Sequence, residues 1–529
     1  MIATSDSFQA VANATIRPLT ANVKISFTKE RAEDMNWFVL DQSQLDGVDI
    51  LATEGDESIQ LWDAYDWGDY TKDLIKMSWS RSVEFPYNVQ SAFCDVVLNN
   101  THGEYTLDNE DSPLAGNILP KRPIRTYAGF KKGGRSEAVP VFIGLSQGLP
   151  KYSERNDDVA TIKAMDFLSE IADMQLQSTL MLRDVRTDEA IAAILDQYGM
   201  DSSMYDLSRG LNTIPFVVFE SGYNAGNILQ KLVQAENGKL WLDEKGIIRF
   251  APRVADIGKT PVAVFDDQNI VDITPSQTSG IVNRVKIKSD IRAVQDYQPI
   301  FTASNENGYE NAPDEDQYRV GANSSSVVWL SFEDPIWSAN VQPTLNGAPD
   351  DSSFIAVDLS GRAVQSGVSI TGVQFAESVK LTITNTNSFA VSLTFIEIWG
   401  EPAKVVDTIK YDAYDEESVE KFGEMVLDIN DNDYFGSYAN ADAYAMDVLK
   451  RRAGFSPTIT LKVKGNPALQ LGDIITINHK YQGDYKIVGI KSVLSNSDGL
   501  ASELTAEKTE VVFPFILDES KLDGDRVLS

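Results

Sequence analysis

The sequence has very few cysteines and histidines. Cys94 is the only cysteine among 529 residues, and His102 and His479 are the only histidines. A disulfide within the chain is therefore excluded, and Cys94, in the apolar run FCDVV, is expected to be a small buried side chain. Two histidines so far apart form no local HExxH or paired-histidine metal motif and no local Ser-His-Asp arrangement.

Long apolar runs and nucleotide motifs are also missing. No run approaches the roughly 18 uncharged apolar residues of a membrane-spanning helix. The first residues, MIATSDSFQAVANATIRPL, lack the basic start and apolar core of a signal peptide, so no export by that route is expected. There is no GxxxxGK(S/T), and Gly222, Gly226 and Gly238 do not form a dinucleotide-binding fingerprint.

Basic residues are scarce. Lys and Arg number 46 against 78 Asp and Glu, which gives a net charge of −32, and the acids are spread along the chain. Because tight binding to nucleic acid draws mostly on Lys and Arg, this composition argues against a protein that grips DNA. It leaves open a surface past which DNA slides.

The hydrophobic content of 43 % is enough for several cores. A prior of roughly 150 residues per domain suggests about three to four domains. Short β-branched or aromatic runs separated by Gly, Pro, Asn and Asp dominate the first 150 residues and predict an all-β barrel or sandwich domain. These runs are ANVKISFT, NWFVL, IQLWDAY, KMSWS, SAFCDVVL, RPIRTYAGF and AVPVFIGL.

The hydrophobic period changes from about residue 181. The run TDEAIAAILDQYG predicts a helix with Thr187 as N-cap and Gly199 as its end. The run NAGNILQKLVQAENG predicts a second helix, capped by Asn224 and terminated by Gly238. The following KLWLDEKGIIRFAPR predicts a hairpin. Together they predict a small helix-and-hairpin domain.

The second half of the chain is again rich in strand signals. The polar, acidic stretch 301–326 is expected to be a linker. Closely spaced strand patterns with Asn-rich turns follow and predict an inserted β-sandwich of about 90 residues. A last helix, ADAYAMDVLKRRAGF, is expected to have Asn440 as its cap and Gly454 after its last turn. Further strands then close the fold.

One segment begins like a calcium loop. Asp428, Asn430 and Asn432 alternate in DINDNDYFGSYANAD. The sixth position is Asp433 instead of the glycine that the turn needs, and the twelfth is Ala439 instead of a bidentate Glu. A solvated turn is therefore favoured over a calcium site.

Acid clusters and surface aromatics each allow two interpretations. The triplets 314–316 and 415–417 are interpreted as solvated loops or helix starts, and carboxylate pairs for sugar cleavage stay open as the alternative. Aromatics in QLWDAYDWGDY suit stacking on sugars, but half-buried strand positions explain them better. They are Trp62, Tyr65, Trp67 and Tyr70.

The segment VVLNNTHGEYTLDNEDSPLAGNILPKRPIRTYAG resembles a pattern near the start of tail-tip (minor tail) proteins of long-tailed, siphovirus-like bacteriophages. In that family a strand ends in a Leu-x-Asn turn, followed by Gly-x-aromatic, Asn, Ser-Pro-Leu, a spacer and a basic-Pro-hydrophobic-Arg strand. Members often have Gly before the Arg-Pro pair, where Lys121 stands here. The matching residues are Leu98, Asn100, Gly103, Tyr105, Asn109, Ser112, Pro113, Leu114, Arg122, Pro123 and Arg125.

The resemblance continues in the same order downstream and covers most of 80–510. FIGLSQGLPKYSERNDDVATIKAMDFLSEIAD is similar to the family's strand, hairpin return and short helix, and NILQKLVQAENGKLWLDEKGIIRFAPR to its helix and hairpin. LTITNTNSFAVSLTFIEIWGEP is similar to its inserted strands, and ADAYAMDVLKRRAGFSPTITLKVKGNPALQLGDIITI with GDYKIVGI to its closing helix and small barrel. The five pieces follow one another in the family's order, and this common order gives the resemblance its weight.

The resemblance implies a mainly β, multi-domain tail hub with small α+β elements. The expected domains are a first tube-like β-barrel (1–180), a helix-and-hairpin domain (181–255), a second tube-like barrel with a helix (256–300 and 404–464), an inserted β-sandwich (301–403) and a small C-terminal barrel and tail (465–529). The segment 98–114 would then be a connector, in which Asn100 and Gly103 tolerate left-handed turns and Pro123 sets the entry of the next strand.

The function implied by the resemblance is structural: a trimeric hub of the phage tail tip that joins the tail tube to distal proteins and encloses the DNA channel. Expected partners are the distal tail or tail tube ring, the tape measure protein and tail fibre or receptor-binding proteins, with DNA passing unbound and no membrane-spanning segment. No catalytic, cofactor-binding or metal residues are expected. The protein would be made in the host cytoplasm and reside in the virion. The alternative is a carbohydrate-binding or carbohydrate-cleaving tail protein.

Overall fold

Strands make up 49 % of this structure and helices 15 %. The computed structural model describes residues 1–27, 65–83, 85–86, 89–148, 150–153, 156–176, 178–198, 200–253, 259–275, 280–304, 318–348, 350–454, 458–497, 499–509, 513–514 and 526–527. The mainly β prediction is confirmed. Two strands expected from the sequence, at 36–40 and 59–65, fall outside the described residues, apart from Tyr65.

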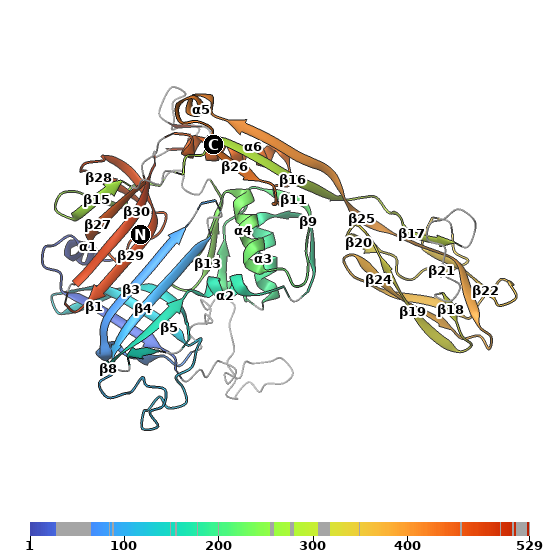
Figure 1. Ribbon diagram of the computed structural model, residues 1–529, viewed down its shortest axis with the longest axis horizontal. Helices are drawn as coiled ribbons and strands as arrows, with labels where there is room; N and C mark the ends of the chain where they lie inside the picture. Colours follow the sequence, from blue (N-terminus) through green and yellow to red (C-terminus); the bar gives the residue numbers. More distant parts are fainter. Residues whose placement is uncertain are drawn as a thin grey trace.

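The largest sheet combines strands from both ends of the chain (Figure 1). Its strands in pairing order are β15 (Ile270–Pro275), β27 (Thr458–Lys464), β30 (Gly499–Lys508), β29 (Gly483–Ser495), β3 (Leu74–Val83), β4 (Gln90–Asn99), β8 (Asn156–Met165), β6 (Arg135–Ser146), β5 (Pro123–Lys132), β1 (Leu19–Ile25) and β2 (Gly68–Asp69). Three short strands join it at the side: β7 (Lys151–Ser153), β14 (Ala263–Phe265) and β28 (Ile474–Ile477).

Period-2 patterning explains this sheet. In β4, Ala92, Cys94, Val96 and Leu98 are buried on one face and alternate with more exposed residues. The junction between the two ends of the chain is the antiparallel pair β3–β29, in which Trp79 lies opposite Ser492. The short helix α1 (Asp6–Ala12) packs on this core through Phe8, whose ring meets Phe130 edge to face at 4.9 Å. The amino-terminal and carboxy-terminal strands therefore form one body.

A helical unit lies beside this sheet. It contains α2 (Phe167–Asp173), α3 (Thr187–Gln197) and α4 (Ala225–Glu236), the strand pair β9 (Leu180–Arg186) and β11 (Thr213–Phe219), and the sheet β10 (Tyr205–Leu207), β13 (Ile248–Ala251) and β12 (Lys239–Leu242). Apolar faces at helical spacing, such as Ile191, Ile194 and Leu195 on α3, form its core. The predicted helices and the β12–β13 hairpin are confirmed.

Three predicted helix ends are wrong by one to a few residues. Helix α3 has Arg186 as N-cap, because Thr187 is buried and its hydroxyl is used elsewhere in the fold. Helix α4 has the predicted Asn224 cap but ends on Asn237, which takes the left-handed conformation one residue before Gly238. Helix α6 (Tyr438–Arg452) begins earlier than predicted, since Ser437 is the residue whose side chain caps it.

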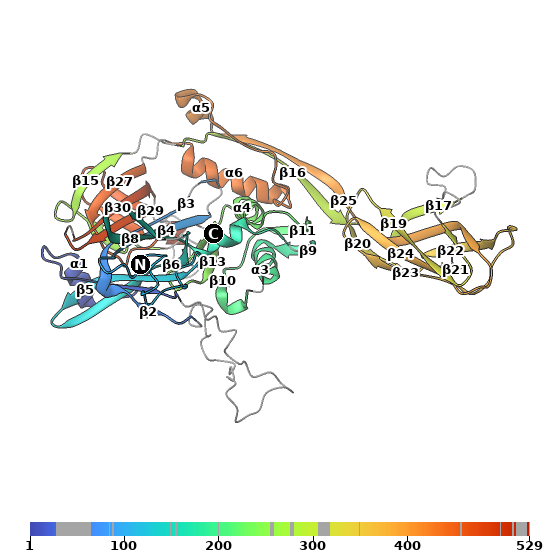
Figure 2. The ribbon, with the colours of Figure 1, turned by 60° about the horizontal axis from the view of Figure 1, so that its bottom comes forward.

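A long two-stranded ribbon leaves the body. Strand β16 (Arg284–Val294) pairs with the inner half of β25 (Val391–Tyr414), and β26 (Val426–Ile429) adds a parallel strand. Helix α6 covers one face of this ribbon through Tyr444, Ala445 and Val448 (Figure 2). The short helix α5 (Glu416–Phe422) follows β25 at the end of the ribbon. Beyond the ribbon the chain forms an arm.

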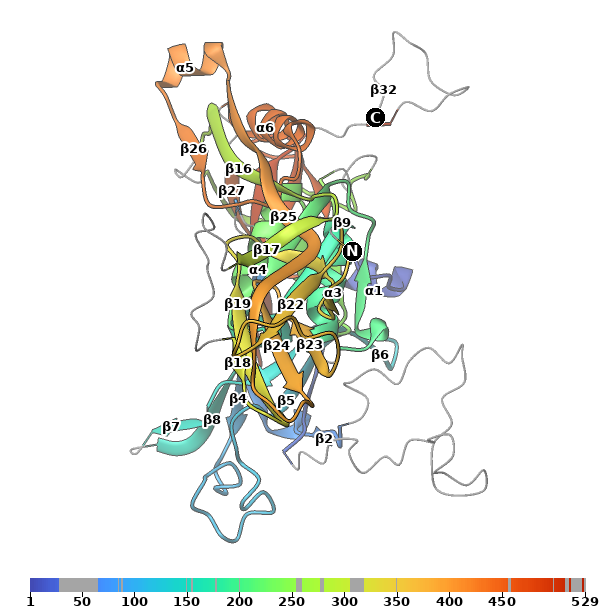
Figure 3. The same cartoon turned by 90° about the vertical axis from the view of Figure 1, so that its right-hand side faces the viewer.

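The arm, residues 298–403, contains two sheets around their own core (Figure 3). One sheet comprises the outer half of β25 with β17 (Gln298–Ser304), β18 (Arg319–Val320), β20 (Ile336–Ala339), β21 (Thr344–Leu345) and β22 (Ser353–Asp358). The other comprises β19 (Ser324–Ser331), β24 (Ser378–Asn385) and β23 (Val368–Gln374). The expected linker 301–326 is wrong at its described ends, because Ala303, Tyr318 and Val320 are buried in this core.

The remaining elements are short. They are the 3-10 turns η2 (Thr71–Asp73) and η3 (Ser202–Met204) and the paired strands β31 (Phe513–Pro514) and β32 (Arg526–Val527). Among the helices of the ranges given above, none is long and apolar enough to cross a membrane.

Candidate functional site

The loop between β4 and β5, residues 100–122, is held together by its own side chains; we call it the connector loop. The Asn100 side-chain oxygen accepts a hydrogen bond from the Tyr105 amide at 2.9 Å. Gly103 has φ of 71°, and its carbonyl accepts a bond from Asn109 Nδ2 at 2.9 Å. These bonds satisfy backbone groups that no helix or strand pairs, so the loop has a defined shape. It projects from one end of the large sheet (Figure 3).

Tyr105 anchors the connector loop. Its side chain is fully buried, and its hydroxyl donates to Asp73 Oδ2 at 2.8 Å. The ring lies 6.0 Å from Tyr70 and 6.3 Å from Phe27. Burial, together with the Asp73 carboxylate, raises the pKa of the Tyr105 phenol, which therefore stays protonated and keeps its donor role. Tyr105, the aromatic residue of the motif, therefore holds the connector loop on the core.

The Ser-Pro-Leu part of the motif closes the loop. The Ser112 hydroxyl donates to the Glu104 carbonyl at 2.6 Å, and the Leu114 amide donates to the Ser112 oxygen at 3.0 Å. Leu114 and Ile118 are buried against the core of the large sheet. Ser112 therefore turns the chain back so that two apolar side chains reach this core.

Lys121 occupies a backbone conformation that favours glycine. Its φ is 58°, while its amide donates to the Ser146 carbonyl at 2.9 Å, so the left-handed turn is fixed by the neighbouring strand. Its ammonium lies 2.6 Å from the Glu170 carboxylate. Next to it, Arg122 is buried and donates from Nε to the Asn117 carbonyl at 3.1 Å, and burial lowers the pKa of its guanidinium.

The outer surface of the connector loop is acidic and partly apolar. Leu107 and Leu119 are exposed, as are Asp108, Glu110 and Asp111. A loop with satisfied backbone groups and exposed leucines suits contact with another protein surface, because little conformational entropy is lost on docking.

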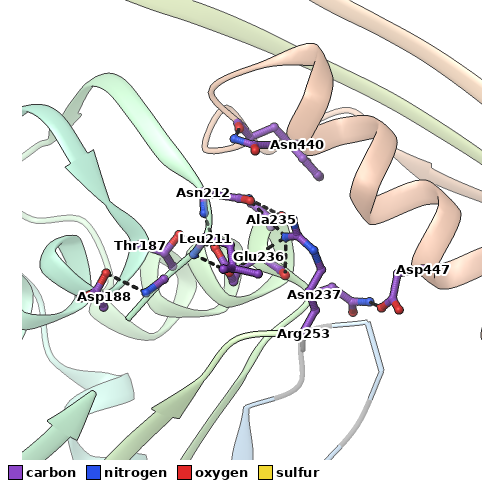
Figure 4. Close-up of polar contacts among 12 residues, drawn as sticks. Thr187, Asp188, Leu211, Asn212, Ala235, Glu236, Asn237, Arg253, Asn440 and Asp447 are labelled. Atoms are coloured by element: carbon purple, nitrogen blue, oxygen red, sulfur yellow. Dashed lines mark hydrogen bonds and ion pairs between the residues drawn. The ribbon is translucent and has the colours of Figure 1, made fainter. Parts of the chain in front are cut away.

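A buried carboxylate ties the helical unit together (Figure 4). Glu236, the last residue of α4, is fully buried. Its Oε2 accepts from the Thr187 hydroxyl and the Asn212 amide, each at 2.9 Å, and its Oε1 accepts from the Leu211 amide at 2.9 Å. The Arg253 guanidinium lies 4.0 Å away. Three donors and one cation compensate the burial of this charge.

The same region reaches helix α6. Asn237, which ends α4, donates from Nδ2 to the Asp447 carboxylate on α6. Arg253 donates to Asn212 Oδ1 at 3.1 Å and to the Glu236 carbonyl at 3.3 Å. This Glu236 network therefore joins α3, α4, the 208–212 loop and α6.

A second buried ion pair joins the helical unit to the large sheet. Arg81 on β3 contacts Glu244, which lies in the turn between β12 and β13. Arg81 also donates to the Val141 carbonyl on β6, and Gln470 Nε2 donates to Glu244 Oε2 at 2.6 Å. Burial lowers the pKa of Arg81 to about 10. Four segments that are distant in sequence meet at this pair.

The segment that begins like a calcium loop is a packing element. Asn432 is fully buried, and its Nδ2 donates to the Lys231 carbonyl and to Gln234 Oε1 at 2.8 and 2.9 Å. Gly436 has φ of 70°, and a Cβ there would lie 2.4 Å from the Thr213 carbonyl. The solvated-turn interpretation is therefore wrong for Asn432: the side chain fixes this loop to α4.

The acid triplets and the aromatic cluster remain from the sequence analysis. Asp415 caps α5, as the helix-start interpretation expects, whereas 314–316 and Trp62 lie outside the described residues. The remaining predicted aromatics, Tyr65, Trp67 and Tyr70, are half-buried as expected, but they flank the two-residue strand β2 and do not lie on a strand.

Histidines and the cysteine lie apart from one another. His102 is exposed on the connector loop, and His479 Nε2 lies 3.2 Å from Asp267. Cys94 is buried as predicted, and burial raises the pKa of its thiol to about 12. Within the described ranges, no group of three or more His, Cys, Asp or Glu is placed to hold a metal ion.

Sequence reasoning missed both buried charge networks. One signal was present, since Glu236 continues the apolar stripe Leu229, Leu232 and Val233 of α4 at helical spacing, where a carboxylate needs partners. For Arg81 and Glu244 no local pattern exists, because the pair forms only through tertiary contacts.

Comparisons with known proteins give distant similarities. No protein-family model matches the chain, and no curated protein matches it. The 43 kDa tail protein of prophage MuSo2 from Shewanella oneidensis is similar in structure at 11 % identity and a TM-score of 0.43, covering 83 % of this chain and 95 % of that one. A tail protein from Neisseria meningitidis MC58 has 10 % identity and a TM-score of 0.45, covering 84 % and 94 %.

The E. coli c3393 protein, a component of the type VI secretion system, has 8 % identity and a TM-score of 0.35, covering 83 % of this chain and 74 % of that one. At such identities, and with TM-scores below 0.5, the function has to be argued from the residues of this chain.

Proposed function

We propose that this chain is a structural protein of a phage tail tip, a trimeric hub that joins the tail tube to distal tip or fibre proteins and surrounds the DNA channel. In this proposal the domains follow the limits expected from the sequence, with tube-like barrels at 1–180 and at 256–300 with 404–464. The chain does no chemistry of its own, and its surfaces dock neighbouring proteins.

The observation that carries the proposal is the fit between the tail-tip motif and the connector loop. Tyr105 anchors the loop, Gly103 and Ser112 turn it, and Pro123 begins β5. Lys121 has a positive φ at the place where the family often has glycine. These residues are neighbours in sequence, so the support for the proposal is that each of them stabilises or shapes the loop.

The internal architecture supports a role that bears load. The Glu236 network and the Arg81–Glu244 pair connect the helical unit to α6 and to the large sheet. Buried charges are costly unless all partners are in place, so these contacts favour one relative arrangement of the units. A hub that holds a tube and distal proteins needs such an arrangement.

The charge balance suits a DNA conduit. A wall rich in Lys and Arg would retain DNA, because each neutralised phosphate releases counterions. A chain with net charge −32 instead repels the duplex within about a Debye length of ~8 Å at physiological salt. Partners in this proposal are the tail tube or distal tail ring, the tape measure protein and fibre or receptor-binding proteins.

Co-expression with the tail tube protein of the same phage tests the proposal. Sedimentation equilibrium should show complexes that contain this chain in multiples of three, since paired barrels must appear three times to match a six-subunit ring. A chain that stays monomeric with and without the tube protein would contradict the hub. The tube protein is included because a ring template can drive trimer formation.

A further inference from the structure

The three-stranded sheet of the arm exposes apolar side chains on its outer face. Trp329 and Val327 on β19 are 54 % and 50 % exposed, and Val373 and Phe375 on β23 and its turn are 56 % and 46 % exposed. The opposite face of the same strands is buried in the arm core. These four residues and the positions between them on β24 are called the arm face.

The two rings of the arm face meet across the middle strand. Cross-strand pairing places Trp329 opposite Lys380 and Ser331 opposite Ser378, while Phe375 leads into the β23–β24 turn. The Trp329 and Phe375 rings stack at 5.5 Å with 30° between their planes. Ser378 is small enough for the rings to meet above it, and Lys380 Nζ lies 5.8 Å from the Trp329 ring centre. We call these two stacked rings, Trp329 and Phe375, the aromatic ledge.

The composition of the arm face differs from that of the whole chain. Apart from the four apolar residues, its paired positions carry only serine, threonine and Lys380. No carboxylate occurs at these paired positions, although the chain has 78 acids. Hydroxyls beside exposed aromatic rings are able to hydrogen-bond a polyhydroxylated ligand and to pack on its C–H faces. Exposed acids border the Phe375 end of the face, with Glu377 in the β23–β24 turn, so the face suits a ligand with few or no negative groups.

The size of the arm face limits its occupant. Three strands about 4.8 Å apart and four rows about 7 Å apart give roughly 400 Å². A stable protein–protein interface buries about 800 Å² on each partner, so a second copy or another folded protein would be held poorly by this face alone. A chain of a few sugar rings fits the area.

We propose that the arm face binds a neutral or weakly anionic polysaccharide, with the Trp329–Phe375 ledge as its main contact. The arm projects away from the sheets and helices of the body, so a long polymer can reach the face (Figure 1). Single-site affinity is weak, and several arms on one particle raise it through avidity. This binding is independent of whether the chain forms a hub.

Affinity electrophoresis of the whole chain tests the proposal. Gels contain purified O-antigen, capsular polysaccharide or soluble teichoic acid–peptidoglycan fragments, with serum albumin as the unretarded reference. At least one polysaccharide should retard the wild-type protein. The double variant Trp329→Ala/Phe375→Ala should lower the apparent affinity about tenfold or more. The control Ile355→Ala removes an exposed apolar side chain from β22 in the other arm sheet and should bind like wild type.

A second variant guards against misfolding. Thr382→Glu adds a carboxylate between Val327 and Thr371 without removing apolar contacts, and it should also weaken retardation. Wild-type melting curves for both variants would exclude unfolding as the cause. The proposal is overturned if no polysaccharide retards the wild type, if the variants are retarded equally, or if the ledge variants instead abolish self-association measured by light scattering.

Discussion

Lys121 has a left-handed backbone conformation that affects the stability of the fold. Its left-handed conformation costs a residue with a Cβ roughly 1 kcal/mol, and its exposed ion pair with Glu170 returns at most about the same. Glycine, common at this place in the resembled family, removes the strain.

We therefore expect Lys121→Gly to raise the free energy of unfolding by about 0.5–1 kcal/mol relative to Lys121→Ala, which loses the ion pair but keeps the strain. Urea unfolding monitored by circular dichroism measures the difference. An alanine variant that is as stable as the glycine variant would show that the strain is absent.

Asp166 gives a prediction about pH. It caps α2, where its Oδ1 accepts from the Ser169 amide at 3.0 Å, and its buried Oδ2 has no partner among the described residues. Burial raises the pKa of this carboxyl in the folded state. The stability that the group contributes is therefore complete below the unfolded pKa and is lost as pH rises through the folded pKa.

Asp166→Asn keeps the capping acceptor and removes the charge, so its stability relative to wild type should increase as pH rises from about 4 to 7. Asp166→Ala should follow the same pH trend but be less stable than Asp166→Asn by about 1 kcal/mol at each pH, because the cap is gone. Thermal melts across this pH range test both. Parallel curves for Asn and wild type would contradict the account.

At the scale of elements, the period of hydrophobic residues and the turn and cap residues predicted much of the fold. Helices α3, α4 and α6 and the β12–β13 hairpin were predicted because each carries a local repeat and a turn or cap signal. The Asn224 cap of α4 was predicted, but the starts of α3 and α6 were not, since the Thr187 hydroxyl donates to Glu236 and Ser437 caps α6 before its apolar repeat begins. The pairing of β3 with β29 has no local signal, because more than 400 residues separate the partners: Trp79 lies opposite Ser492.

The Glu236 network connects several of these elements, so its loss should lower the free energy of unfolding of the whole body. Glu236→Gln places an amide where backbone donors point and leaves Arg253 without its carboxylate. We expect a loss of about 2–4 kcal/mol in unfolding free energy. Glu110→Gln on the exposed connector loop is the matched control and should change stability by less than about 0.5 kcal/mol. A Glu236→Gln protein within that range would refute the role of the network.

The arm is predicted to be removable. Val294 and Ala403 are the last paired residues of the β16–β25 ribbon, so an Asn-Gly turn can join them in place of the arm. The product loses the Phe216–Trp337 ring contact and the Arg292–Asp334 ion pair but keeps the ribbon under α6. It should be soluble and melt cooperatively.

A shorter ribbon, with Ile287 joined to Tyr411, serves as the control for this deletion. It removes Ile409, which is buried beneath α6, and should therefore be insoluble or melt without cooperativity. Aggregation of the first deletion, or equal behaviour of the two, would show that the arm is an integral part of the body.

At the scale of the molecule, the proposed hub rests on a stiff body, an acidic chain and a peripheral arm. The stiffness comes from strands of both chain ends in one sheet and from the two buried charge networks. The acidic surface follows from the net charge of −32. Sequence alone suggested the ring through family resemblance, whereas the contacts that hold one chain rigid required the structure.

The most direct test of the hub is electron cryomicroscopy of the chain assembled with its tail tube protein. The account predicts a three-fold ring of this chain around an open or plugged axial channel, with the connector loop in a protein contact and a channel wall that is neutral to acidic. Single chains scattered on the particle surface, or a channel lined mainly by Lys and Arg, would contradict it.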